Sequence, residues 1–180
     1  MKQFLTTLLM AGALSPVMAG IGHQKTGGLY LSMNDYLADH RYYAYSNMKL
    51  HTRKPYLSIR ADNGKMQVPR DSIFAVTLRD GKTYRLLGHT SYEILNRNAR
   101  LLLYKRKIMT AVKTFPRDNF QYYFSVGDGP LQELTGWNLK NAFSGRKALP
   151  DQLDVNFRQD SDLMSYDSFH HMYKLEWLLQ

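Results

Sequence analysis

Between residues 55 and 107 the chain runs in short stretches of alternating apolar and polar residues, separated by turn sequences. Asp62-Asn63-Gly64 and Asp80-Gly81 are typical of tight hairpins, because Asn and Gly accept the positive φ that a type I′ turn requires. After the second turn, Tyr84 and Leu86 alternate with Thr83 and Arg85, as in antiparallel strands with one face in water. This segment predicts about five strands of an antiparallel β-meander.

The same alternation assigns further side chains to strand faces, and Pro69 is expected to end a strand or to lie on an edge, because it has no backbone N–H to donate. Three groups of residues should each share a face: Phe74, Val76 and Leu78; Tyr92 and Ile94; Leu101 and Leu103.

The flanking segments add a short strand and a helical turn before the meander, and helices after it. Leu29 to Leu31 is typical of a strand, and Ser32 or Asn34 can cap a turn over 35–39. Segment 119–130 predicts another strand, with Phe120, Tyr122 and Phe124 on one face.

After this strand, apolar spacing of about 3.6 residues predicts a helix over 131–145 with Gly145 as its C-cap. Pro150 should begin a second helix, with Leu153 and Phe157 four residues apart. The spacing predicts a third over 163–179, after a cap at Asp160 or Ser161. The expected fold is therefore α+β: an antiparallel meander of about five to seven strands followed by two or three C-terminal helices packed on it.

The first nineteen residues have the layout of a secretory signal peptide. Lys2 precedes an uncharged and mostly apolar run from Phe4 to Leu14, Pro16 breaks it, and Val17-Met18-Ala19 precedes a predicted cut before Gly20. The apolar run is shorter than the roughly 20 residues that span a bilayer. We therefore expect residues 1–19 to be removed and 20–180 to form a single domain, periplasmic or secreted.

The chain contains no cysteine, so a domain in an oxidising compartment would fold on its core without disulfides. An anchor through an N-terminal cysteine is also excluded, and the mature sequence has no further apolar segment of membrane-spanning length. These features favour a soluble mature protein.

Charge is distributed unevenly along the chain. Residues 20–147 hold 21 Lys and Arg against 9 Asp and Glu, whereas residues 148–180 hold 2 against 6. Either the acidic end docks on the basic body, or the body meets an anionic partner such as an envelope component. A basic balance is also compatible with a merely solvated surface.

The densest basic run is Lys105-Arg106-Lys107 at the end of an apolar strand. Together with nearby residues it predicts a basic patch on the exposed face of the meander, with an aromatic ring for stacking. The candidate binding residues are Arg85, Arg100, Tyr104, Lys105, Arg106 and Lys107. The alternative is that these charges flank an apolar strand and suppress edge aggregation.

Catalytic motifs are weak. There is no cysteine nucleophile and no GxSxG motif, and the proximity of Ser91 to His89 is too common a combination to indicate a triad. Asp128 lies in a glycine-rich bend between a strand and a helix, where a turn-forming role is the simpler interpretation. The sequence identifies no catalytic residue and predicts no cofactor.

The histidines near the end of the chain do not predict a metal site. On a helix His170 and His171 would point about 100° apart, whereas two ligands of one ion need a spacing of three or four residues. Asp167 lies three residues before His170 and four before His171, but an Asp–His hydrogen bond explains this spacing as well as a metal site does. If the helix docks through its aromatic face, Trp177→Ala should cost about 3–5 kcal/mol.

Three phrases, GLYLSMNDYL, VPRDSIFAVTLRDGKTYRLL and YDSFHHMYKLEWLL, resemble a group of small exported proteins of Gram-negative bacteria without an assigned function. The resemblance covers most of the mature chain. It implies an export signal and strands followed by C-terminal helices, and it transfers no functional residue.

The sequence favours a non-enzymatic binding or scaffolding domain of the bacterial envelope. The alternative is a hydrolase that acts on an envelope or extracellular polymer. The sequence does not identify the partner; an anionic envelope component or another protein is expected, and export argues against nucleic acid as the physiological partner.

Overall fold

The computed structural model describes residues 27–45, 50, 54–61, 64–108 and 119–180. The predicted signal peptide and its cut before Gly20 lie outside the described residues, as do Asp62 and Asn63 of the first predicted hairpin.

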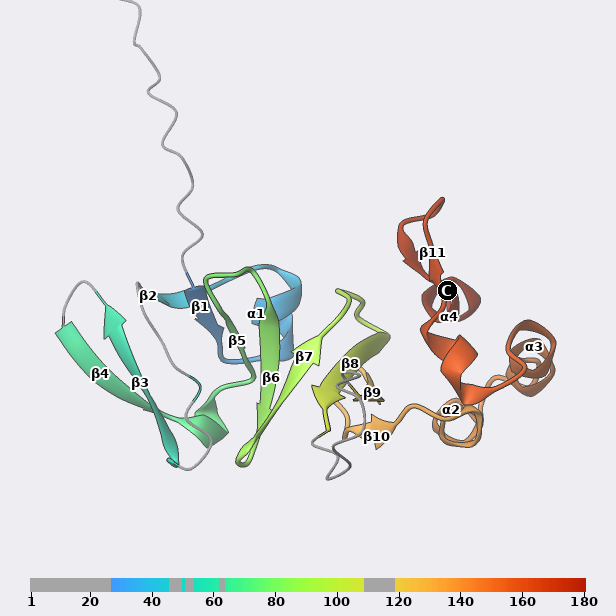
Figure 1. Cartoon of the computed structure of the whole chain (residues 1–180), viewed down its shortest axis with the longest axis horizontal. Coiled ribbons are helices and arrows are strands. Elements are labelled where there is room, and N and C mark those ends of the chain that lie inside the picture. Colours follow the sequence, from blue (N-terminus) through green and yellow to red (C-terminus); the bar gives the residue numbers. More distant parts are fainter. Residues whose placement is uncertain (1–26, 46–49, 51–53, 62–63, 109–118) are drawn as a thin grey trace, which may run out of the picture.

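An eight-stranded antiparallel sheet, in the order β10-β9-β8-β7-β6-β5-β1-β2, forms the body of the molecule (Figure 1). Strands β5 to β10 lie side by side in chain order, which confirms the predicted meander. The strands are β1 (Gly27–Tyr30), β2 (Tyr42–Tyr45), β5 (Ala75–Thr77), β6 (Thr83–Leu87), β7 (Thr90–Ile94), β8 (Leu101–Lys107), β9 (Phe120–Val126) and β10 (Gln132–Glu133).

A short helix, α1 (Met33–Leu37), connects β1 to β2. Ser32 caps it, because its hydroxyl accepts a hydrogen bond from the Asp35 backbone N–H while the Asp35 carboxylate accepts from the Ser32 N–H. The predicted cap at Ser32 is confirmed. The helix buries Met33 and Tyr36 against the sheet.

Strands β3 (Tyr56–Ala61) and β4 (Gly64–Pro69) pair as a separate antiparallel hairpin, so these residues are not part of the main sheet although the sequence placed them in the meander. Gly64 has φ +114°, a conformation in which a Cβ would be strained. Pro69 is the last residue of β4, as predicted, and the 3₁₀ turn η1 (Arg70–Ser72) follows it. At the second predicted turn Gly81 has φ +85° between β5 and β6.

The two faces of the sheet are covered by different elements. On one face α1 packs over a cluster that includes Tyr30, Leu102 and Tyr104. On the other face the β3–β4 hairpin covers the β1–β5–β6 end, where Leu29, Val76 and Leu86 are buried. The C-terminal helices cover the β8–β9 end of this second face, where Leu101, Leu103 and Phe124 are buried.

One of the predicted face assignments is wrong. Phe74 precedes β5 and packs with the α1 cluster, whereas Val76 within β5 packs with the β3–β4 hairpin. The two side chains were expected on one face, but the chain turns into the strand between Ile73 and Ala75 and the alternation begins only there. Tyr92 with Ile94, and Leu101 with Leu103, share a face as predicted.

Helices α2 (Gly136–Ala142) and α3 (Leu149–Asn156) follow the sheet, and both bury leucines against it. The helix predicted over 131–145 is shorter than expected: residues 132–133 form β10 instead, and Thr135 begins α2 by accepting a hydrogen bond from the Asn138 N–H. Phe143, not Gly145, is the C-cap of α2. Pro150 lies in the first turn of α3, as predicted.

The predicted third helix over 163–179 is wrong. The chain instead forms the 3₁₀ turn η2 (Asp160–Met164), a two-stranded hairpin of β11 (Tyr166–Asp167) and β12 (Met172–Tyr173), and a short helix α4 (Lys174–Leu178). His171 has φ +53°, which no α-helix allows. Both histidines therefore lie in the turn of a hairpin, and α4 buries Leu175 but leaves Trp177 55% exposed.

Among the described residues, no helix combines the length and the apolar character that crossing a membrane requires.

Candidate functional site

The candidate site is a pocket of about 490 Å³ on the middle of the sheet, over β6, β7, β8 and the start of β9. It lies on the face that the β3–β4 hairpin and the C-terminal helices cover at its two ends. Ten residues line it: Lys82, Tyr84, His89, Thr90, Ser91, Glu93, Lys105, Arg106, Lys107 and Phe120.

Strand register explains why these side chains meet. Tyr84 is paired with Glu93 and Glu93 with Lys105, so the three lie in a row across β6, β7 and β8. Lys107 is paired with Phe120 across β8 and β9. Paired residues point to the same face, as do residues two apart on one strand, so Lys105 and Lys107 also project together.

The pocket is basic. Lys82, Lys105 and Lys107 bring ammonium groups to it, and Glu93 is the one carboxylate among the described residues of the lining. Lys105 Nζ lies 3.2 Å from Glu93 Oε1 and 5.3 Å from the centre of the Phe120 ring, and the Lys105 side chain is only 25% exposed. Arg106 also borders the pocket, but its guanidinium lies over the Tyr92 ring, which packs with the α1 cluster on the opposite face. Two ammonium groups, those of Lys82 and Lys107, therefore accompany one that Glu93 already partly neutralises.

Tyr84 adds a neutral hydroxyl to the floor of the pocket. Burial raises the pKa of Tyr84, and the negative charges of Glu93 and Asp80 raise it further. The hydroxyl thus remains protonated and able to donate a hydrogen bond at neutral pH. Thr90 and Ser91 bring two more hydroxyl groups to the lining.

The six predicted patch residues lie in three places. Lys105, Arg106 and Lys107 line the pocket. Arg85 and Tyr104 are buried on the opposite face of the sheet, where they hydrogen-bond to each other. Arg100 lies near the C-terminus and donates to the backbone carbonyls of Leu179 and Gln180.

Sequence reasoning missed Lys82, Tyr84, Glu93 and Phe120 as site residues. Their positions were available in principle, since two-residue alternation places each of them on one face of its own strand. The sequence does not show which residues of neighbouring strands pair, and this register decides whether these faces lie on the same side of the sheet.

Ser91 and His89 both line the pocket. Within the described part of the chain, no hydrogen bond joins the Ser91 hydroxyl to a side chain that would act as a base. Activation of a serine needs such a contact. Asp128 lies elsewhere, on the exposed turn after β9, with its Oδ1 3.7 Å from Arg85 Nη2.

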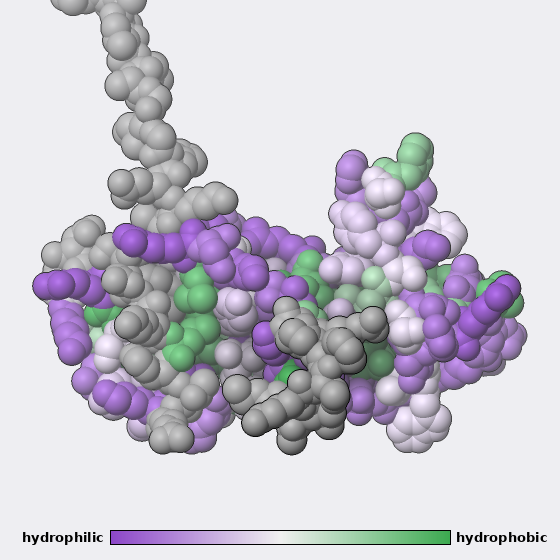
Figure 2. Space-filling model, in the orientation of Figure 1, coloured by the Kyte–Doolittle hydropathy of each residue, from purple (hydrophilic) through white to green (hydrophobic). Residues whose placement is uncertain are grey.

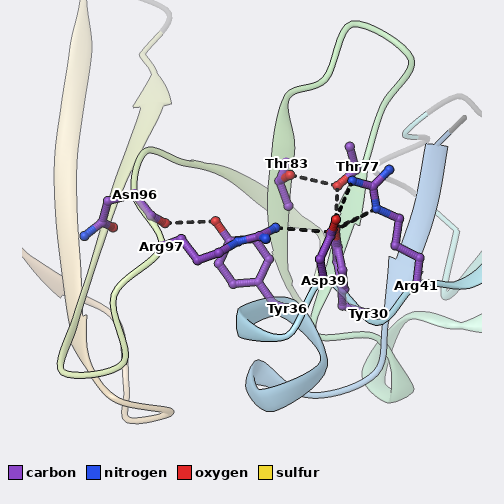
Figure 3. A network of polar contacts seen from close by, with 8 residues as sticks. All are labelled: Tyr30, Tyr36, Asp39, Arg41, Thr77, Thr83, Asn96 and Arg97. Carbon is purple, nitrogen blue, oxygen red and sulfur yellow. Dashed lines mark hydrogen bonds and ion pairs between the residues drawn. The ribbon is translucent and has the colours of Figure 1, made fainter. Parts of the chain in front are cut away.

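A second polar cluster joins the α1–β2 segment to the sheet (Figure 3). The Tyr30 hydroxyl donates to Asp39 Oδ1 at 2.6 Å, and Arg41 and Arg97 pair with the same carboxylate. These contacts lower the pKa of Asp39 to about 2, with the Tyr30 hydrogen bond as the largest cause. Asp39 has φ +55°, so the cluster also holds an uncommon backbone conformation. Its groups satisfy one another, which indicates a structural role.

Asp167 pairs with His170 rather than forming part of a metal-binding cluster: its Oδ2 lies 2.6 Å from His170 Nδ1. No group of three or more His, Asp or Glu residues suited to holding a metal ion occurs in the ranges that the structure describes.

No protein-family model matches the chain, and no curated protein or solved structure shows significant similarity to it.

Proposed function

We propose that the protein is a non-enzymatic binding domain whose basic pocket holds an anionic polysaccharide of the envelope or cell exterior. The observation that carries this proposal is the lining of the pocket, where the ammonium groups of three lysines meet one carboxylate among the described residues. Carboxylate, phosphate or sulfate groups on a glycan would pair with Lys82 and Lys107, while Lys105 stays between Glu93 and Phe120.

The other lining groups suit a glycan better than a simple inorganic anion. Thr90, Ser91 and Tyr84 offer hydroxyl groups for hydrogen bonds to sugar hydroxyls, and Phe120, 37% exposed, offers an apolar surface. A pocket of this volume is within the range of about 300–1,000 Å³ that small-ligand sites occupy.

The hydrolase alternative has less support. Glycoside hydrolysis ordinarily uses two carboxyl groups on opposite sides of the scissile bond. Among the described residues, the lining supplies only Glu93, and an ion pair with Lys105 already engages that residue.

The test is titration calorimetry with polygalacturonate, an anionic polysaccharide, and with neutral dextran. We expect binding to polygalacturonate that weakens as salt rises, because exposed charges are screened. The double variant Lys82→Gln/Lys107→Gln should bind about tenfold more weakly, since exposed ion pairs contribute up to about 1 kcal/mol each.

The matched control is Lys65→Gln/Lys147→Gln, which removes the same charge at two exposed positions outside the pocket. It should retain most of the affinity. Equal weakening by the two double variants would show that the interaction follows net charge alone and would reject the pocket as the site.

We also propose that the protein is exported and cleaved before Gly20, on the basis of its first nineteen residues. N-terminal sequencing of protein recovered from its native host should begin at Gly20. Recovery of intact Met1 from a host with working export would reject this proposal.

A further inference from the structure

The hairpin of β11 and β12 projects from the C-terminal helices as a narrow arm (Figure 1). Its two strands pair Tyr166 with Tyr173 and Asp167 with Met172, and residues 168–171 form the turn. The rings of Tyr166 and Tyr173 pack edge to face with their centres 5.3 Å apart, which stiffens the base of the arm. In the space-filling view the end of this arm is hydrophobic and stands clear of the body (Figure 2).

The carboxylate of Asp167 organises the turn. Its Oδ1 accepts hydrogen bonds from the backbone N–H groups of Phe169 at 2.9 Å and His170 at 3.2 Å, and its Oδ2 pairs with His170 Nδ1. Two backbone donors at the tip are therefore satisfied from within the turn. The tip can therefore enter an apolar environment at a lower cost, because unsatisfied backbone groups strongly oppose such entry.

The turn presents aromatic residues to the outside. Phe169 is 85% exposed at the tip, and its ring meets His170 edge to face. Tyr166 at the base of the arm and Trp177 on the adjacent α4 are each more than half exposed. A folded turn that displays a fixed aromatic ring loses little conformational entropy when that ring is buried by a partner.

The charge of the body favours an anionic partner. Residues 20–147 hold 21 Lys and Arg against 9 Asp and Glu, so a negative surface attracts the body of the protein. At the tip Lys174 is exposed, and the one carboxylate between Ser165 and Lys174 is Asp167, which the turn itself engages. The outward chemistry of the arm is therefore aromatic and close to neutral.

From these observations we propose that the tip of the β11–β12 hairpin inserts Phe169 into the interface of an anionic lipid bilayer. Tyr and Trp favour the headgroup level of a bilayer, and basic residues are attracted to its negative surface. A projecting tip reaches the apolar boundary below the headgroups while the body stays in water. The insertion of Phe169 uses none of the pocket residues, so it can be tested separately from the polysaccharide pocket.

The test is co-sedimentation of the full-length mature protein with vesicles. One set contains equal amounts of phosphatidylglycerol and phosphatidylcholine, and the other contains phosphatidylcholine alone. We expect binding to the anionic vesicles, and a loss of about tenfold or more in Phe169→Ala, because insertion would bury most of that side chain. Phe169 is exposed, so the variant should melt like wild type.

The matched control is Val155→Ala, which removes an apolar side chain that is 82% exposed on α3. It should bind vesicles like wild type. Absence of wild-type binding to the anionic vesicles would overturn the proposal, and so would equal binding by Phe169→Ala and Val155→Ala. Loss of binding in Lys82→Gln/Lys107→Gln with full binding in Phe169→Ala would assign the membrane contact to the pocket and also overturn the proposal.

A second copy of the chain is the competing occupant of the tip. Without lipid, sedimentation equilibrium should give the same association state for the wild type and for Phe169→Ala. Such an association, together with weak vesicle binding, would assign the tip to self-association and reject the bilayer.

Discussion

Arg85 Nη1 donates a hydrogen bond of 2.8 Å to the hydroxyl of Tyr104, and both side chains are buried. Ser125 completes a triangle, since its Oγ lies 2.9 Å from the Tyr104 hydroxyl and 3.2 Å from Arg85 Nη1. The guanidinium also stacks over Phe74. Burial raises the pKa of Tyr104, while the hydrogen bonds from Ser125 and Arg85 lower it. The Arg85–Tyr104 pair is therefore part of the core.

Arg85→Ala should destabilise the protein by about 2–4 kcal/mol, because it leaves the Tyr104 and Ser125 hydroxyls without their cationic partner and removes buried packing. Urea unfolding would measure the change. Arg79→Ala, at an exposed position, should stay within about 0.5 kcal/mol of wild type. Equal effects of the two substitutions would contradict the burial of the Arg85 guanidinium.

The Asp39 cluster should make stability depend on pH at its acid end. A carboxylate whose pKa is lowered in the folded state stabilises that state above its unfolded pKa, near 3.8, and the contribution disappears as pH falls toward about 2. Asp39→Asn removes this contribution and keeps a residue that tolerates positive φ. The difference in melting temperature between wild type and Asp39→Asn should therefore be constant near neutral pH and shrink between about pH 4 and 2.

Asp151→Asn is the control for this pH dependence. Within the described residues, the exposed Asp151 carboxylate makes no hydrogen bond or ion pair. The change between about pH 4 and 2 should be larger for Asp39→Asn than for Asp151→Asn, because Asp39 loses the contacts that lower its pKa. An equal change for the two variants would mean that the Tyr30–Asp39 contact does not form in solution.

Substitution of Leu175 by Ala should destabilise the protein more than substitution of Trp177, although Trp is the larger side chain. Leu175 is fully buried, so Leu175→Ala should cost about 2–5 kcal/mol. Trp177 is 55% exposed, so Trp177→Ala should cost about 1 kcal/mol or less, in place of the larger loss that a docked aromatic helix implies. Thermal melts would rank the two variants. A larger loss of melting temperature for Trp177→Ala would show that the Trp177 side chain is docked against the core.

Gly129 should not tolerate a side chain. A Cβ there would lie 2.8 Å from the carbonyl oxygen of Val126, and the Gly129 carbonyl accepts a hydrogen bond from Arg85. Gly129→Ala should cost about 1–3 kcal/mol, as overpacking commonly does. Gly145→Ala meets no atom within 4 Å and should be neutral or stabilising by up to about 1 kcal/mol. Chemical unfolding of both variants would reveal whether the bend after β9 is as tight as described.

Local sequence was sufficient for much of the α+β fold. Alternation and the Asp80-Gly81 turn predicted the meander, Pro150 the start of α3, and Ser32 the cap of α1. These features depend on contacts within a few residues, where turn chemistry and strand period act directly. Export and the function of the protein stay predictions.

The C-terminal hairpin shows where local reasoning failed. The apolar spacing of residues 163–177 fits a helix, but the Asp167 side chain bonds the next backbone N–H groups and competes with the helical pattern. The stacking of Tyr166 on Tyr173 and the bond from the Lys174 N–H to the Ser165 carbonyl then close a hairpin. Neither contact has a signature in helical periodicity.

The sequence alone determined that the chain is basic, free of cysteine and able to form a meander, because composition and two-residue alternation need no partner strand. Only the tertiary structure decided that Lys105 and Lys107 share a pocket with Glu93 and Phe120, while Arg85 enters the core. The physical reason is register: the pairing of β6, β7, β8 and β9 selects which faces coincide, and the packing of α1, the β3–β4 hairpin and the C-terminal helices selects which of those faces are buried.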